Sequence, residues 1–131
     1  MDSPSGGVST LPLLSVLEVN PGGGLPNVAF LSYNLYVGFN NGSIRIFSYT
    51  PTNIQLIGTL QGHTDPISGF LQNGKYLLSF SCDGTMRLWD AGKQECLTTF
   101  SGHTRAIYAA AYSADGKILF SGSKDKTIRV W

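Results

Sequence analysis

The chain has 131 residues, of which 42% are hydrophobic and 13% are charged, and its formal net charge is +1. This length corresponds to at most one ordinary domain, and the small net charge excludes a strong electrostatic attraction to nucleic acid or to an anionic membrane. No apolar segment approaches the about 20 residues of a membrane-spanning helix. A secretory signal is not expected either, because no basic residue precedes the mildly apolar segment 11–17.

The N-terminal segment carries few signals for regular structure. Residues 1–12 are rich in Ser, Gly and Pro, and we expect a disordered tail there. Within 13–27, the sequence LLSVLEV (13–19) can form a latch strand, whereas prolines and glycines make 20–27 a loop. This loop lacks the Gly-Lys-Ser/Thr ending of a phosphate-binding loop, so a nucleotide site is not expected.

From residue 28 onward the chain reads as a series of short strands without any helical period. Asn-Gly or Asp-Gly pairs lie between strands at 41–42, 73–74, 83–84 and 115–116. Such pairs predict two-residue hairpins with positive φ at both central positions, and hence consecutive antiparallel strands. The expected strands are 28–32, 35–39, 43–48, 54–60, 67–71, 75–80, 85–89, 96–100, 107–112, 117–121 and 127–131.

One unit occurs twice in this series. Residues 61–100 contain Gly-His-Thr at 62–64 and Leu-Trp-Asp at 88–90, and residues 101–131 contain Gly-His-Thr at 102–104 and Val-Trp at 130–131. Residues 28–60 form a degenerate copy, because YVGFNNGSIRIFS (36–48) aligns without gaps with LSFSCDGTMRLWD (78–90). A period of about 40 residues with these signatures is typical of a four-stranded propeller blade. We predict an all-β repeat domain over 13–131 with about three blades, the last lacking its fourth strand.

With these motifs the chain is similar to the WD40-repeat β-propeller family over residues 28–131. The resemblance implies a structural hydrogen-bonded tetrad of His, Ser, Asp and Trp in each blade. Such a set satisfies an indole N–H and an imidazole that the neighbouring blades bury. Carried over position by position, the two tetrads are His63, Ser79, Asp83 and Trp89, and His103, Ser121, Asp125 and Trp131.

Catalytic and metal-binding interpretations of the same residues are weaker. A catalytic Ser-His-Asp triad occurs once in an active site. The set found here occurs in two repeats and includes a Trp that a triad does not need. A zinc site from the two histidines with Cys82 and Cys96 matches no usual ligand spacing. No basic residue close in sequence activates Cys82 as a thiol. We therefore expect no enzymatic activity, no metal and no cofactor.

The two cysteines also bear on location. They fall at non-equivalent positions of the repeat, so a structural disulfide is not expected, and a reducing intracellular compartment is favoured. The cytoplasm is the expected location, with the nucleus as the alternative.

The family resemblance implies that partners bind to the narrow face where the first strand of each blade begins. Other proteins or peptides are the expected partners, and a merely solvated rim is the alternative. Aromatic and basic side chains dominate binding hot spots, which favours Tyr108 with Arg105 and Lys124 as a contact cluster. The candidate positions are Pro66, Ser68, Cys82, Arg105, Ala106, Tyr108 and Lys124.

We expect a non-catalytic scaffold for interactions between proteins. The alternative is a structural assembly subunit, or a fragment of a longer WD40 protein such as a ubiquitin-ligase adaptor, a G-protein-β-like protein or an RNA-processing factor. Known propellers close with typically four to eight blades, so three are too few for a ring. Two chains forming a homodimer would supply six, and a longer chain, which we favour, would supply the rest.

Overall fold

The structure is a computed structural model that describes residues 27–31 and 33–131. The described residues form eleven strands and no helix. The first sheet consists of β1 (Asn27–Leu31), β2 (Asn34–Gly38), β3 (Ile44–Thr50) and β4 (Asn53–Leu60). The second consists of β5 (Ile67–Asn73), β6 (Tyr76–Ser81), β7 (Met86–Asp90) and β8 (Glu95–Phe100). The third consists of β9 (Ile107–Tyr112), β10 (Leu119–Ser123) and β11 (Ile128–Val130).

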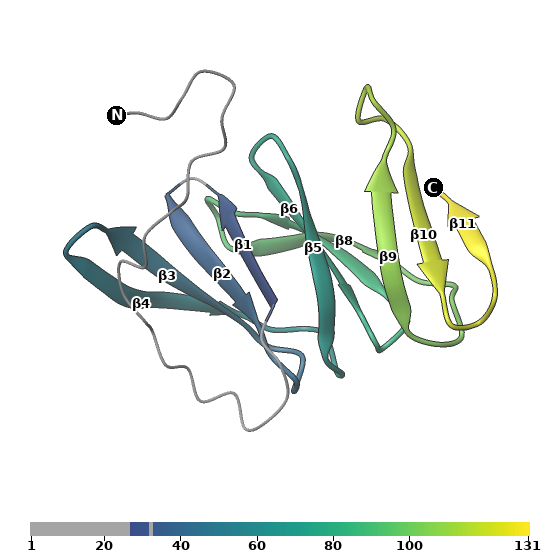
Figure 1. The fold of residues 1–131 in the computed structure, drawn as a ribbon, viewed down its shortest axis with the longest axis horizontal. Helices are drawn as coiled ribbons and strands as arrows, with labels where there is room; N and C mark the ends of the chain where they lie inside the picture. Colours follow the sequence, from purple (N-terminus) through teal and green to yellow (C-terminus); the bar gives the residue numbers. More distant parts are fainter. Residues whose placement is uncertain (1–26, 32) are drawn as a thin grey trace, which may run out of the picture.

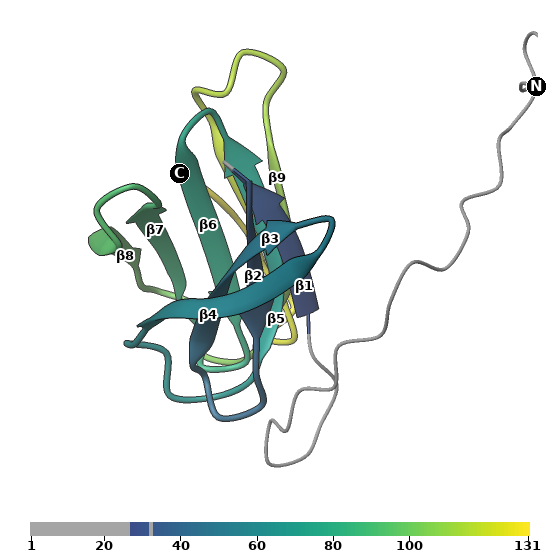
Figure 2. The ribbon, with the colours of Figure 1, turned by 90° about the vertical axis from the view of Figure 1, so that its left-hand side faces the viewer.

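Each sheet is a meander in which consecutive strands pair antiparallel. The three sheets lie side by side in chain order, with the first and third at opposite ends of the molecule (Figure 1). The first strands of the sheets are neighbours, because β1 contacts β5 and β5 contacts β9. Figure 2 looks at the same array from the side of the first sheet. The expected all-β fold with propeller-type sheets is confirmed.

The hydrophobic core consists of the layers between neighbouring sheets. Leu77 and Leu78 are adjacent on β6 and are both fully buried, but they belong to different clusters. Leu77 packs with Tyr36 and Ile44 of the first sheet, and Leu78 packs with Ile107 of the third. Since successive side chains of a strand point to opposite faces, the second sheet is apolar on both faces.

The end sheets each have one face that no other sheet covers. The outer face of the first sheet carries Arg45 and the apolar residues Val28, Phe30, Leu35, Val37, Phe47, Tyr49, Ile54 and Leu56, as the strand pairing shows. Val37, Phe39 and Phe47 form a buried cluster there with Leu35 and Ile54. The outer face of the third sheet carries Ala109, Ala111, Phe120, Gly122, Ile128 and Val130.

The turns differ from the expected hairpins. At 41–42, 73–74, 83–84 and 115–116 only the glycine has positive φ, with +84° at Gly84. The preceding Asp83 keeps a negative φ because its carboxylate accepts a hydrogen bond from the backbone N–H of Thr85 at 2.8 Å. Such an Asx turn fixes the chain without a second left-handed residue. The prediction of positive φ at both positions was therefore wrong.

The strands otherwise follow the expected ones within a few residues, and β1 begins one residue early, at Asn27. The expected tail (1–12) and all but the last residue of the expected latch strand and loop (13–27) lie outside the described residues. In the part of the chain that the structure describes, no helix is long and apolar enough to cross a membrane.

Tyr36 offers a test of the layer between the first two sheets. Its side chain is fully buried, and its hydroxyl has no hydrogen-bond partner among the described residues. Tyr36→Phe should leave the free energy of unfolding unchanged or raise it by up to about 1 kcal/mol, because an unpaired buried hydroxyl costs free energy. Tyr36→Ala should cost about 3–5 kcal/mol through the cavity. Urea denaturation measures both, and a clear loss in Tyr36→Phe would show that the hydroxyl is paired.

Candidate functional site

The second sheet brings His63, Ser79, Asp83 and Trp89 together. His63 lies in the loop before β5, Ser79 on β6, Asp83 in the turn after β6 and Trp89 on β7. The Ser79 hydroxyl lies 2.7 Å from His63 Nε2 and accepts a hydrogen bond from Trp89 Nε1 at 2.9 Å. The Asp83 carboxylate lies 2.8 Å from His63 Nδ1.

These contacts fix the protons of a neutral imidazole. A carboxylate only accepts, so His63 Nδ1 carries the proton that it donates to Asp83 Oδ2. Nε2 is then the acceptor, and the Ser79 hydroxyl donates to it while accepting from the Trp89 indole. Every polar atom in the set has a partner, so the set can hold the entry loop against β6 and β7.

The third sheet repeats this arrangement. Ser121 Oγ lies 2.7 Å from His103 Nε2 and 2.9 Å from Trp131 Nε1, and Asp125 Oδ2 lies 2.7 Å from His103 Nδ1. Trp131 is half-buried, whereas Trp89 is buried. The two sets therefore share one geometry but differ in their access to water.

Hydrogen bonding decides the charge state of both carboxyl groups. Burial alone would raise the pKa of Asp83, but hydrogen bonds from His63 and Thr85 outweigh burial and hold the pKa well below its usual range. The pKa of Asp125 is lowered chiefly by the hydrogen bond from the Thr127 hydroxyl, with His103 and backbone N–H groups adding to the effect against burial. Both side chains are thus carboxylates at neutral pH.

Sequence reasoning missed a fifth member of each set. The Thr85 hydroxyl donates to Asp83 Oδ1 at 2.6 Å and lies 3.2 Å from His63 Nδ1, and Thr127 makes the same contacts with Asp125 and His103. The signal was present, because a threonine follows the aspartate by two residues in both copies.

A serine two residues before each aspartate was also missed. The Ser81 hydroxyl donates to the backbone carbonyls of Asp65 and Pro66 and accepts from the N–H of Asp83 at 3.0 Å. Ser123 likewise joins the carbonyl of Arg105 to the N–H of Asp125. These serines anchor the loop before the first strand to the turn that carries the aspartate.

The glycine before each histidine is needed because an arginine side chain lies close to it. A Cβ atom on Gly62 would lie only 2.6 Å from Nη1 of the Arg87 guanidinium. Arg129 covers Gly102 in the same way. A side chain at either glycine would displace the arginine. Arg87 and Arg129 therefore pack against the entry loops of their own sheets.

In the first sheet the corresponding positions are apolar. Val37 stands where Ser79 does and Phe47 where Trp89 does, and both are buried. Asn41 keeps the turn, because its side-chain oxygen accepts from the N–H and the hydroxyl of Ser43 at 2.9 and 2.7 Å. Arg45 lies over the ring of Phe39 at 5.0 Å. This face thus contains neither an indole nor a serine that needs a histidine.

The candidate partner-binding residues fall into two groups at one end of the sheets, which we call the rim. In the second sheet the N–H of Cys82 donates to the carbonyl of Pro66 at 2.9 Å, and Cys82 Sγ lies 3.5 Å from Ser68 Oγ. In the third sheet the N–H of Lys124 donates to the carbonyl of Ala106 at 2.9 Å.

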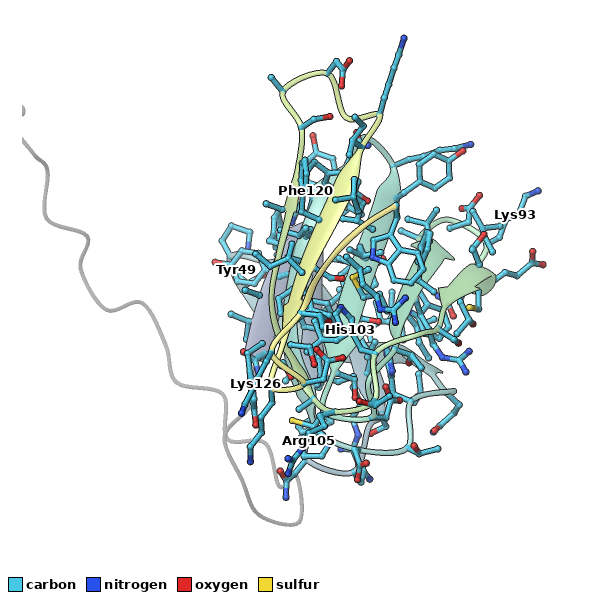
Figure 3. All side chains as sticks on the ribbon, turned by 90° about the vertical axis from the view of Figure 1, so that its right-hand side faces the viewer. Tyr49, Lys93, His103, Arg105, Phe120 and Lys126 are labelled. Carbon is cyan, nitrogen blue, oxygen red and sulfur yellow. The ribbon has the colours of Figure 1, made fainter. Side chains whose placement is uncertain are left out.

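The third-sheet group is the more accessible one. Four of the candidate rim residues are half-buried, namely Pro66, Ser68, Cys82 and Ala106. The other three are more accessible. Arg105, Tyr108 and Lys124 are exposed, and the backbone N–H of Lys124 donates to the carbonyl of Ala106. Figure 3 places Arg105 and Lys126 together at the rim, away from Phe120. Among the described residues no hydrogen bond joins the two groups.

The metal-binding side chains and the cysteines are the remaining groups that the sequence singles out. Within 27–31 and 33–131, no group of three or more His, Cys, Asp or Glu side chains could hold a metal ion. Cys82 and Cys96 are free thiols, and Cys96 is the exposed one.

Meandering sheets joined along their first strands, with a repeated Trp–Ser–His–Asp set, define an array of propeller blades. A family model described as "WD domain, G-beta repeat" matches residues 54–90 and 94–131. The chain belongs to the WD40-repeat family. Membership in this family supports a general role as a scaffold for interactions between proteins.

Curated proteins with similar sequences include three fungal ones. Cell division control protein 4 of Saccharomyces cerevisiae is 35% identical over 86 residues, which cover 66% of this chain and 11% of that protein. SIR4-interacting protein SIF2 of the same yeast is 40% identical over 88 residues, covering 66% of this chain and 16% of that protein. Nuclear distribution protein PAC1-2 of Uncinocarpus reesii is 38% identical over 85 residues, which cover 57% of this chain and 18% of that protein. The chain thus matches less than a fifth of the length of each.

The serine at the centre of each set can be tested by truncation. Ser79→Ala removes the acceptor of the Trp89 indole and the donor to His63, and we expect a loss of about 2–3 kcal/mol in the free energy of unfolding. Ser121→Ala is the matched control and should cost less, because water can reach the half-buried Trp131. Urea denaturation measures both variants, and equal losses would contradict the difference in burial.

The carboxylate of Asp83 predicts a pH dependence. Its pKa is lower in the folded chain than the ordinary value of about 3.9, so its stabilising effect is complete well above pH 4 and is lost as the pH falls toward the folded pKa. Asp83→Asn should therefore be less stable than the natural chain near pH 7, with the difference shrinking toward about pH 3. Asp65→Asn, at an exposed carboxylate on the entry loop, is the control in the same urea titrations. A difference that does not change with pH would contradict the role of the Asp83 charge.

Proposed function

We propose that this chain is a non-catalytic scaffold that binds a protein or peptide through the rim of its second and third sheets. The observation that carries the proposal is the repeated bond between the turn after the second strand and the loop before the first. The N–H of Cys82 bonds to Pro66 and that of Lys124 bonds to Ala106, so equivalent residues of two sheets form one edge.

The composition of the rim supports a protein partner. Tyr108 and Arg105 are exposed residues of the types enriched in binding hot spots, and Lys124 adds a second positive charge near them. The tetrads below this edge hold its backbone in place, which reduces the ordering cost of binding. A positively charged rim with an exposed tyrosine favours a peptide that carries an acidic residue beside an aromatic or aliphatic one.

Structural assembly is the second candidate function. Val28 on the first sheet and Ile128 and Val130 on the third are exposed apolar side chains on the outer faces. Exposed apolar faces of this kind mark surfaces that bind other proteins. Tyr108 and Lys124 line one hollow with Ile128, whereas Val28 does not, so substitution of Val28 tests assembly separately from the rim.

We place this activity inside the cell, in the cytoplasm or the nucleus, without direct contact with nucleic acid. The net charge of +1 and the two free thiols support this proposal.

Substitutions at the rim test the first candidate. Tyr108→Ala and Lys124→Glu should each weaken binding of a captured partner at least about tenfold, because they remove a hot-spot contact and reverse a charge. Tyr33→Ala and Lys117→Glu are matched controls at exposed residues away from the rim and from the outer faces. Quantitative pulldown from extract, followed by titration with the purified partner, measures the change. Partners that bind all four variants equally would contradict the rim and favour assembly through the outer faces.

A further inference from the structure

The rim carries opposite charges in its two halves. Asp65 in the second sheet and Arg105 in the third both come directly after the Gly-His-Thr segment of their entry loops, and both are exposed. The same comparison pairs Cys82 with the exposed Lys124. A serine of the following strand donates to the carbonyl of Asp65 in one sheet and to that of Arg105 in the other, each at 3.0 Å. One backbone geometry therefore presents a carboxylate in one repeat and a guanidinium in the next.

The other charged groups at this end do not cancel the difference. Arg87 and Arg129 pack on the entry loops at equivalent places, so they add one positive charge to each half. Asp83 and Asp125 are both ionised at neutral pH and add one negative charge to each half. The halves then differ by one carboxylate in the second sheet and by three cations in the third, the third cation being Lys126.

The two halves adjoin along the rim. The N–H of Cys82 donates to the carbonyl of Pro66, which joins the entry loop of the second sheet to its turn at 82–84. A Cβ on Gly84 would lie 3.3 Å from the carbonyl oxygen of Arg105, so this turn lies against the entry loop of the third sheet. One turn thus separates Asp65 from Arg105. Because packed sheets lie about 10 Å apart and an extended chain rises about 3.3 Å per residue, about three residues of a bound segment span this separation.

Opposite charges at a fixed spacing select one orientation of a bound segment. A basic residue beside Asp65 and acidic residues beside Arg105 and Lys124 make favourable contacts in both halves, whereas the reverse placement brings like charges together in both. We propose that the rim binds an extended segment of a partner protein that carries one basic residue and, about three residues away, acidic residues. Asp65 fixes the orientation of this segment. The inference rests on the proposed binding at the rim and adds the charge pattern of the partner.

Selection of peptides tests the charge pattern. Random twelve-residue peptides displayed on phage are selected on the natural chain, and an enriched peptide is synthesised with a fluorescent label for titration by fluorescence polarisation. Enriched peptides should carry a lysine or arginine about three residues from aspartate or glutamate, because this spacing matches the distance between the two halves.

Neutral variants of the chain assign each contact. Asp65→Asn should weaken binding of the enriched peptide at least about threefold, but should not affect a version of the peptide with alanine at its basic residue, since that pair is already lost. Arg105→Gln should behave in the same way toward a version without the acidic residues. Glu95→Gln and Lys117→Gln, at exposed residues away from the rim, are the matched controls and should leave the Kd unchanged. Circular dichroism checks that every variant is folded.

The outcomes separate this inference from rim binding itself. Failure to enrich any peptide, or peptides that bind Tyr108→Ala as tightly as the natural chain, would contradict both. Peptides that Tyr108→Ala weakens but that carry no basic residue would overturn the charge pattern and leave rim binding in place. The same conclusion would follow if the loss in Asp65→Asn were equal with and without the basic residue of the peptide.

Discussion

The structure of the second and third sheets depends on one hydroxyl in each. Ser79 and Ser121 accept from a tryptophan and donate to a histidine, so a single small side chain joins three segments that are distant in sequence. The histidine in turn holds the aspartate of the turn, and that aspartate caps the backbone of the next strand. Neutral hydrogen bonds in a buried place are worth little singly but are costly to break, and this set positions the loop that forms the rim.

The first sheet shows how the same fold manages without this set. Val37 and Phe47 replace the serine and the tryptophan, and packing against Phe39 takes the place of hydrogen bonding. An apolar cluster needs no precise loop position, whereas a buried indole does. The polar sets of the later sheets thus fix loop geometry, while the first sheet retains only the Asn41 turn. The difference gives the second and third sheets the better-defined loop geometry at this edge.

Most of the fold and the members of the tetrads could be predicted from the sequence, because both are repeated. Period-2 alternation and the Gly-His and Trp-Asp signatures locate the strands, and the repeat spacing pairs His63 with Ser79 and Asp83. The turn conformation was mistaken because the Asp83 side chain, rather than a left-handed backbone, closes the turn. The roles of Thr85 and Ser81 were missed because short hydroxyl side chains are common in loops, and only their three-dimensional partners distinguish them.

The placement of Leu77 and Leu78 has a consequence for how such an array holds together. Because one strand is buried on both faces, the second sheet takes its stability from two neighbours, whereas the first and third sheets each pack against one neighbour among the described residues. The free energy of the array then resembles that of a short linear chain of coupled units, with terms for each unit and for each junction. In such a system opening begins at the ends and moves inward, and every added junction raises the stability of all the units already joined.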